Sequence, residues 1–127
     1  MLSLPLPVRI FLCTRNADLR KSFDGLAQMV REFLSADPLS GHLFVFRNKR
    51  GDRLKLLYWD NDGLAIWYKR LEKGNFRFPV AATSDGQGGV EIRAADFAML
   101  LDGVDLGSVK RQPRYCRPLP EQAKLPT

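Results

Sequence analysis

The sequence predicts a single α+β domain in which an antiparallel sheet packs against one main helix. Two observations support this fold class. Apolar residues recur at helical spacing over residues 19–34, whereas residues 43–72 contain three segments rich in aromatic and branched side chains, separated by turn-forming residues. The chain has 127 residues, of which 45% are hydrophobic and 27% are charged, and these values fit one ordinary globular domain.

The N-terminal part of the chain predicts a first strand and the main helix. Arg9 is the only charge in residues 8–13, so we expect this strand to be buried on both faces. Asp18 is positioned to cap the helix over residues 19–34, and Gly25 inside that helix predicts the close approach of another backbone. The apolar stripe predicts that the helix buries Phe23, Leu26, Val30 and Phe33.

Residues 43–72 are predicted to form a three-stranded antiparallel meander at the centre of the sheet. The predicted strands are Leu43–Asn48, Arg53–Asp60 and Leu64–Leu71. The segments between them, Lys49–Asp52 and Asn61–Gly63, have the Gly, Asn and Asp content of hairpin turns.

The C-terminal part of the chain predicts smaller elements. We expect short strands at Phe76–Phe78 and Val90–Arg93 and a short helix over about residues 95–101, which Gly103 ends. Four of the eight prolines follow residue 108. We therefore divide the chain into one domain of residues 1–107 and a basic tail of residues 108–127 that is extended or disordered.

The charge of the protein is positive and unevenly distributed. The formal net charge is +6 and the sequence pI is about 9.7. Residues 47–77 hold nine basic and four acidic side chains, residues 78–107 hold one and five, and residues 108–127 hold five and one. Such blocks indicate an anionic partner, most commonly nucleic acid, although a solvated basic surface has the same composition.

The order of the strands predicts where the basic residues gather. In a meander, the end of the first strand, the start of the second and the end of the third meet at one edge. If each hairpin is centred on its turn, Arg47 faces Arg53 and Lys55 faces Lys69, and such like-charge pairs favour a bound anion such as a phosphate backbone. The residues predicted to bind DNA at this basic edge are Arg47, Lys49, Arg50, Arg53, Lys55, Lys69, Arg70 and Lys73.

Four aromatic residues lie on the same meander: Tyr58, Trp59, Trp67 and Tyr68. Aromatic side chains beside basic ones can stack on the bases of single-stranded nucleic acid. Cross-strand packing is the commoner role of aromatic residues in strands, and we favour it here.

Four carboxylates on the meander raise the alternative of a small metal-dependent nuclease, because two-metal catalysis needs clustered acids. They are Asp52, Asp60, Asp62 and Glu72. Asp52 lies in the first turn, whereas Asp60 and Asp62 flank the second, so we do not expect the four to converge.

Other kinds of site find no support, and we expect no catalytic residue, metal or cofactor. His42 is the single histidine, and neither Cys13 nor Cys116 has a histidine nearby in the sequence. No apolar run approaches the length of a membrane span, and the N-terminus lacks the basic region of a signal peptide. With two cysteines, a cytoplasmic protein with no membrane partner is expected.

Several segments, in one order over residues 4–105, resemble the accessory proteins called TnpB of the insertion sequence 66 family of bacterial transposable elements. The resemblance is most specific over residues 18–76. The segments that carry it are DLRKSFDGL at 18–26, DPLSGHLFVF at 37–46, RGDRLK at 50–55, WD at 59–60 and KRLEKGNF at 69–76.

This resemblance implies a protein that is encoded beside a separate transposase and a second small accessory protein, and that is needed for efficient transposition without cutting DNA itself. The family implies no catalytic residues. We therefore expect a non-catalytic accessory factor that binds DNA, the transposase or both through the basic edge. The alternatives are the small nuclease and a pure protein–protein adaptor, in which the basic edge meets an acidic surface of the transposase.

Overall fold

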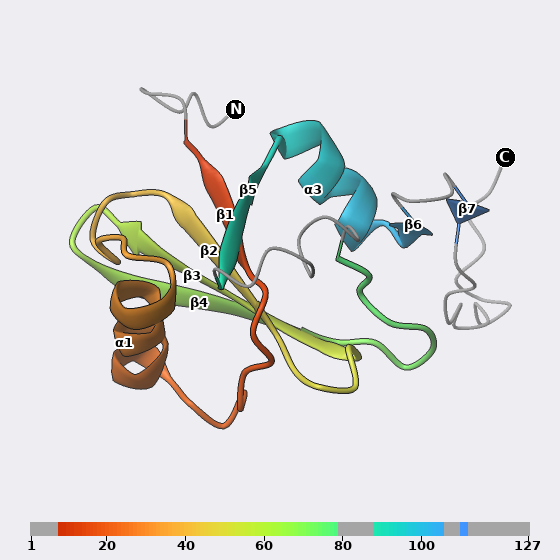
Figure 1. Cartoon of the computed structure of the whole chain (residues 1–127), viewed down its shortest axis with the longest axis horizontal. Helices are drawn as coiled ribbons and strands as arrows, with labels where there is room; N and C mark the ends of the chain where they lie inside the picture. The colour runs from red at the N-terminus through yellow and green to blue at the C-terminus, as the bar shows by residue number, and fades with distance from the viewer. Residues whose placement is uncertain (1–7, 79–87, 106–109, 112–127) are drawn as a thin grey trace, which may run out of the picture.

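A five-stranded sheet with one helix on each face forms the centre of the molecule (Figure 1). The computed structural model describes residues 8–78, 88–105 and 110–111. Its elements, in chain order, are β1 (Ile10–Cys13), α1 (Phe23–Phe33), β2 (Leu43–Arg47), β3 (Arg53–Asp60), β4 (Gly63–Arg70), β5 (Gly89–Ile92), α3 (Ala94–Leu101), β6 (Val104–Asp105) and β7 (Lys110–Arg111).

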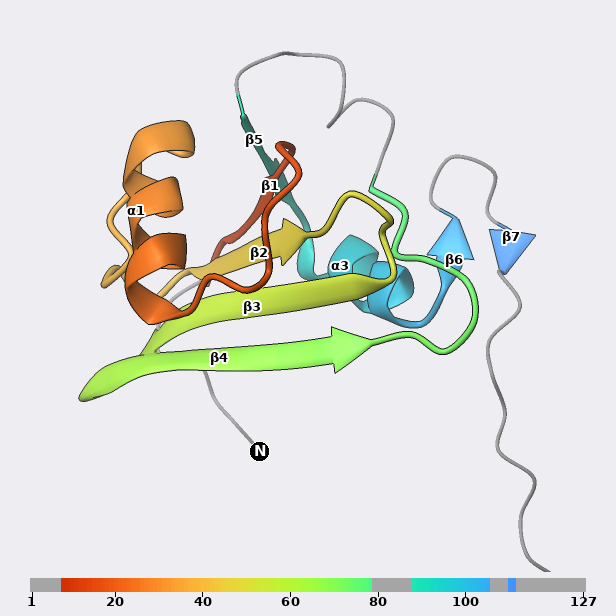
Figure 2. The same cartoon turned by 90° about the horizontal axis from the view of Figure 1, so that it is seen from below.

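The sheet has the strand order β4-β3-β2-β1-β5, and Figure 2 shows β4 at one edge of it. Strands β2, β3 and β4 form the predicted antiparallel meander, and β5 runs antiparallel to β1. The exception is β1, which pairs with β2 in parallel, with α1 in the connection between them. The predicted α+β class is confirmed, and the parallel pair is the feature that the sequence did not predict.

Helix α1 covers one face of the sheet. Its side chains Leu26 and Val30 are fully buried and lie in one hydrophobic cluster with Phe44, Phe46 and Leu57. These three sheet residues come from alternate positions of β2 and β3, which point to the same face. Burial of this apolar stripe, rather than helix propensity, holds α1 in place.

Helix α3 covers the opposite face. Phe97 and Leu100 pack with Leu12, Val45 and Leu54, which again alternate with the residues of the first face. The predicted C-terminal helix is therefore confirmed, and Gly103 follows it with a φ of +86°. Helix α1 extends over β3 to the first half of β4, where Leu64 and Ile66 pack against its cluster, whereas the last four residues of β4 are exposed.

The start of the main helix was wrongly predicted. Helix α1 begins at Phe23, and its N-cap is Ser22, which makes no side-chain capping bond. Asp18 instead accepts hydrogen bonds from the backbone and side chain of Arg20 in the turn before the helix. Because Phe23 lies in the first turn, at the open end of the helix, it is 44% exposed rather than buried.

Two smaller predictions also need correction. The group close to Gly25 is the side chain of Lys21, not a backbone, since a Cβ built on Gly25 would lie 3.0 Å from the Lys21 Cβ. Residues 76–78 form no strand. Phe76 and Phe78 are buried on the α3 face, and the Phe76 N–H donates to the carbonyl of Gly51 at 2.7 Å.

The predicted tail is only partly described. Within residues 108–127, Lys110–Arg111 form β7, which pairs with β6, and the rest lies outside the described residues. Most of the predicted loop Ser84–Gly89 lies outside them as well.

Candidate nucleic-acid interface

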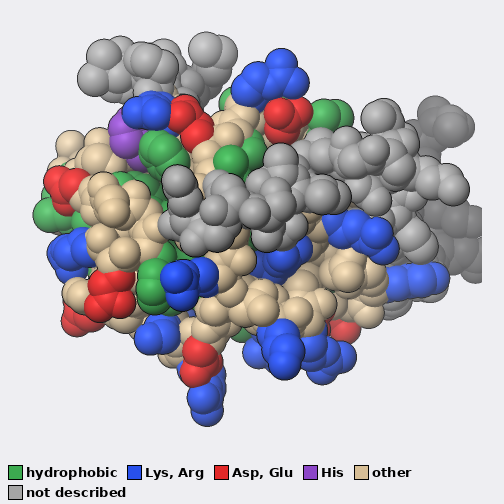
Figure 3. Space-filling view, viewed as in Figure 1, with side chains coloured by type: hydrophobic (Ala, Val, Ile, Leu, Met, Phe, Trp, Pro, Cys, Tyr) green, Lys and Arg blue, Asp and Glu red, His purple; other side chains and the backbone are tan. Residues whose placement is uncertain are grey.

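Basic side chains gather at one end of the sheet, where β2 ends, β3 begins and β4 ends (Figure 3). Antiparallel pairing of β3 and β4 brings Arg53 beside Lys69 and Arg70. The turn between β2 and β3 and the segment after β4 add three lysine and arginine residues. The exposed residues of this group, which we call the basic end, are Lys49, Arg50, Arg53, Lys69, Arg70 and Lys73.

The register of the hairpins differs by one residue from the prediction. Arg47 lies opposite Leu54, and Lys55 lies opposite Tyr68. The like-charge pair that does form is Arg53 opposite Arg70. In the β3–β4 hairpin the difference arises because the strands are joined by a two-residue turn, with Asp60 opposite Gly63, and not by a three-residue loop.

Two residues of the predicted basic edge point inward. Lys55 is 8% exposed, its Nζ donates to the backbone carbonyl of Lys21 at 2.8 Å, and it lies 4.7 Å from the centre of the Tyr68 ring. Arg47 is half-buried, stacks over Phe78 at 4.1 Å and donates to the carbonyl of Phe76 at 2.9 Å, and burial lowers its pKa. Both side chains stabilise the fold and leave little charge for a ligand.

In the part of the chain that the structure describes, the two carboxylates at the basic end, Asp52 and Glu72, are already engaged. Glu72 forms an exposed ion pair with Arg70 at 3.0 Å. Asp52 accepts a hydrogen bond from the Asn48 amide at 2.8 Å. That bond, together with the nearby charges of Arg50 and Arg53, lowers the pKa of Asp52. The remaining cations at this end are in excess: within the described residues, the Lys49, Lys69 and Lys73 ammonium groups have no ion pair or hydrogen bond.

The aromatic residues of the meander divide between packing and exposure. Tyr58 and Trp59 are half-buried, as the cross-strand packing interpretation predicts, whereas Trp67 is 40% and Tyr68 is 47% exposed. The Tyr68 hydroxyl accepts a hydrogen bond from Arg53 at 3.3 Å, so its ring is held among cations on the α1 face. Trp67 lies on the opposite face, because neighbouring residues of a strand alternate.

Sequence reasoning missed one neighbour of the basic end. Lys21 precedes α1, far from the meander in sequence, but its carbonyl binds Lys55. This contact brings the backbone of Lys21 beside β3, whereas its side chain lies along Gly25 of α1. Only the packing of α1 on the sheet shows the proximity; the unusual Gly25, which leaves room for the Lys21 side chain, is the one local signal.

Comparison with known proteins gives the family of the chain. Residues 8–111 match the family model described as "IS66 Orf2 like protein" (TnpB_IS66). This protein belongs to the IS66 Orf2-like family. Two relatives from Sinorhizobium fredii are each 40% identical to it: the uncharacterized protein y4jC over 106 residues, covering 84% of this chain and 87% of the relative, and y4hO over 98 residues, covering 77% and 82%. No solved structure matches the chain.

Membership of the IS66 Orf2-like family makes this protein a transposition-associated accessory protein, as the resemblance implied. The family is not one of known enzymes. Among the described residues, no helix has the length and apolar character needed to cross a membrane.

The acidic residues of this IS66 Orf2-like protein do not converge. Asp52 and Glu72 lie at the basic end, whereas Asp60 and Asp62 lie at the opposite end of the β3–β4 hairpin. The eight residues from Asp52 to Asp60 separate the two pairs by about 27 Å, at 3.4 Å per residue. Within the described ranges, no three His, Cys, Asp or Glu residues form a group suited to a metal ion.

His42 and Cys13 have structural roles. His42 directly precedes β2, where its Nδ1 accepts the backbone N–H of Arg9 at 3.1 Å and its ring meets Phe11 edge to face. Cys13 is buried in β1, and burial raises the pKa of its thiol. Cys116 lies outside the described residues.

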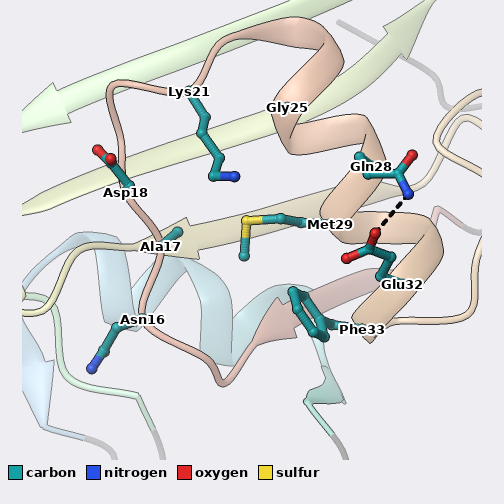
Figure 4. Close-up of a pocket in the computed structure, with 9 residues that line it drawn as sticks. All are labelled: Asn16, Ala17, Asp18, Lys21, Gly25, Gln28, Met29, Glu32 and Phe33. Carbon is teal, nitrogen blue, oxygen red and sulfur yellow. Dashed lines mark hydrogen bonds between the residues drawn. The ribbon is translucent and has the colours of Figure 1, made fainter.

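A hollow of about 480 Å³ lies between α1 and the segment before it (Figure 4). Met29 and Lys21 point into it, and Phe33 closes one side. On its rim the Gln28 amide donates to Glu32 at 2.7 Å, and Asp18 is bound to Arg20. Of its polar lining side chains, Asp18, Gln28 and Glu32 are engaged in these bonds, whereas the Lys21 ammonium and the Asn16 amide have no side-chain partner among the described residues.

Proposed function

We propose that this protein is a non-catalytic accessory factor of transposition that binds the phosphate backbone of DNA through the basic end. The observation that carries the proposal is the gathering of six exposed cations from three chain segments at one end of the sheet. The two nearby carboxylates, Asp52 and Glu72, do not balance them.

The β3–β4 ladder adds a physical reason for an anionic partner. Arg53 and Arg70 occupy directly opposite positions of an antiparallel pair, where like charges destabilise a sheet. A phosphate between them would relieve this repulsion and accept hydrogen bonds from both guanidinium groups. Lys69 lies opposite the buried Leu54, on the other face of the sheet. Cations therefore lie on both faces and can contact a DNA backbone that passes around the end of the sheet.

Such contacts give affinity without sequence preference, because phosphates carry no base information. Target choice would then come from the transposase and the second small accessory protein of the element, which are the protein partners that the family implies. An acidic surface on the transposase is the other anion that the basic end fits.

The experiment measures the affinity of the protein for duplex DNA by fluorescence anisotropy over a range of salt concentrations. If the six cations each contact a phosphate, the logarithm of the affinity should fall with the logarithm of the salt concentration with a slope of about −5. The double variant Arg50→Ala and Lys69→Ala should reduce the magnitude of this slope by about 2 for all DNA sequences.

The matched control is Arg9→Ala with Arg93→Ala. These exposed arginines lie at the opposite end of the sheet and have ion pairs with Glu91 and Asp96. The control therefore makes the same change in net charge without touching the basic end, and its slope should stay close to that of the wild type.

An equal effect of both double variants would show that net charge alone drives binding and would contradict the proposed site. Absence of DNA binding at low salt would refute the DNA proposal; capture of the transposase after nuclease treatment would then favour the adaptor. Incubation with magnesium should leave the DNA intact, since shortened fragments would support the nuclease alternative.

A further inference from the structure

Strand β4 is one edge of the five-stranded sheet, and within the described ranges no further strand pairs with it. It is eight residues long, and its last four residues are exposed. Two of the four large apolar side chains that are exposed in the described structure, Trp67 and Tyr68, lie on it. A long edge strand with exposed aromatic residues is a template for pairing with another strand.

The hydrogen bonding of the hairpin determines which backbone groups of this edge are available. The N–H of Leu71 donates to the carbonyl of Asp52 at 2.7 Å, and Asp60 lies opposite Gly63. Residues at odd positions of β4 therefore bond to β3, and residues at even positions direct their N–H and C=O groups away from the sheet. The outward set is Leu64, Ile66, Tyr68 and Arg70.

The edge also has opposite charges at its two ends. Asp60 ends β3 and Asp62 lies in the turn before β4, whereas Lys69 and Arg70 lie at the end of β4. A second copy in parallel orientation would bring like charges together. An antiparallel copy would bring each acidic turn beside a basic strand end.

We propose that β4 pairs with β4 of a second copy in antiparallel orientation, with the two-fold axis at Ile66, so that two sheets join into one. In an antiparallel ladder the outward-facing residues of both strands must lie opposite each other, which allows only registers in which even positions pair with even positions. Placing Ile66 opposite the partner's Ile66 satisfies this condition.

Side-chain size and charge select this register. On one face, the bulky Trp67 lies opposite the partner's Ala65, in a closely spaced pair without backbone hydrogen bonds. On the other face, Tyr68 lies opposite the partner's Leu64, and Arg70, the last residue of β4, lies beside the partner's Asp62 in the turn that precedes β4. Each contact occurs twice because the interface is two-fold symmetric.

Two allowed registers neighbour this one, with the axis at Ala65 or at Trp67, and both are less favourable. With the axis at Ala65, Tyr68 would face the partner's Asp62, and Arg70 would extend past the end of the partner's β4, because Asp60 lies on β3. If the axis passed through Trp67, the two tryptophans would face each other, Arg70 would face the partner's Leu64, and Glu72 would face the partner's Asp62. That arrangement loses both ion pairs and adds two like-charge contacts. Because one strand edge buries less surface than a standard interface, we expect a weak dimer, with a Kd of roughly 10–100 μM.

The experiment measures the dimer Kd of the full chain by sedimentation equilibrium without DNA. Asp62→Arg and Arg70→Asp should each raise the Kd by about tenfold or more, because each places like charges opposite one another twice. The double variant restores opposite charges and should return the Kd to within about threefold of the wild-type value. Lys49→Asp, in the turn between β2 and β3, is the control for the charge change of Arg70→Asp and should leave the Kd unchanged.

A second measurement tests the register directly and does not depend on charge. In a Cys116→Ser background, Ala65→Cys with Trp67→Cys should form disulfide-linked dimers on mild oxidation, because closely spaced antiparallel pairs bring Cα atoms within disulfide distance. Ala65→Cys alone should not, since it lies opposite Trp67.

A chain that stays monomeric at about 1 mM, well above the expected Kd, would overturn the proposal. So would a dimer whose Kd is not restored by the charge exchange and that forms no disulfide with the paired cysteines. Binding of DNA by the basic end is measured separately, and its failure would leave the dimer proposal standing.

Discussion

Replacement of Lys55 by methionine separates a lysine that holds the fold from one that faces a ligand. Lys55 is 8% exposed, and its Nζ contacts the Lys21 carbonyl and the Tyr68 ring. Methionine keeps the apolar stem and removes the charge. A hydrogen bond from a charged group contributes about 1.5–3 kcal/mol, and a partly desolvated cation–π contact about 1 kcal/mol.

Relief of the buried ammonium offsets part of this loss, so we expect Lys55→Met to lower the free energy of unfolding by about 1–2 kcal/mol. With a urea m-value of about 2 kcal/mol/M, the midpoint of unfolding should fall by about 0.5–1 M. Lys69→Met is the control: Lys69 is exposed and unpaired within the described chain, and its change should stay within about 0.5 kcal/mol.

The salt dependence of DNA binding should rank the two variants in the opposite order, with the larger effect for Lys69→Met. Lys69→Met should reduce the magnitude of the slope by about 1, and Lys55→Met should leave it unchanged. A Lys55→Met protein that is as stable as the wild type but has a reduced slope would show that Lys55 faces the phosphates, and would refute the assignment of this side chain to the fold.

Two further predictions concern a carboxylate and a pair of glycines. The Arg20 guanidinium bound to Asp18 lowers the pKa of the Asp18 carboxyl from 3.8 to about 2. The stability that this ion pair contributes should therefore be present above pH 3.8 and be lost as the pH falls through about 2. A carboxyl NMR titration should find the midpoint of Asp18 at about 2, and Arg20→Gln should move that midpoint toward 3.8. Gly88→Ala should lower the free energy of unfolding by at least about 1 kcal/mol more than Gly41→Ala does. Both glycines have φ near +90°, but only a Cβ on Gly88 would meet a backbone atom, the Phe33 carbonyl oxygen at 2.8 Å. Equal losses for the two variants in urea unfolding would contradict this reasoning.

Local sequence patterns were sufficient for the elements of the meander. The strands at 43–47, 53–60 and 63–70 lie within one residue of the predicted bounds, because strand composition and turn residues act between chain neighbours. The gathering of Lys69, Arg70 and Arg53 followed from strand reversal alone, which needs no knowledge of the register.

Facing pairs and side-chain direction depended on finer geometry. A two-residue turn at Asn61 and Asp62 moved the register by one residue, and this change put Tyr68, not Lys69, opposite Lys55. Helix α1 then covered that face of β3, so Lys55 became buried and donated to the Lys21 carbonyl. The prediction of eight ligand-facing cations therefore became six.

By itself, the sequence determined the α+β class, the meander, the two helices and the end of the sheet where positive charge gathers, because periodicity, turn chemistry and strand reversal are local properties of the chain. Tertiary structure decided the parallel pairing of β1 with β2, the inward direction of Arg47 and Lys55, and the exposure of Phe23 and of the β4 edge. Those features depend on which segments pack together across the chain, and the burial of apolar surface that selects this packing is a property of the whole core.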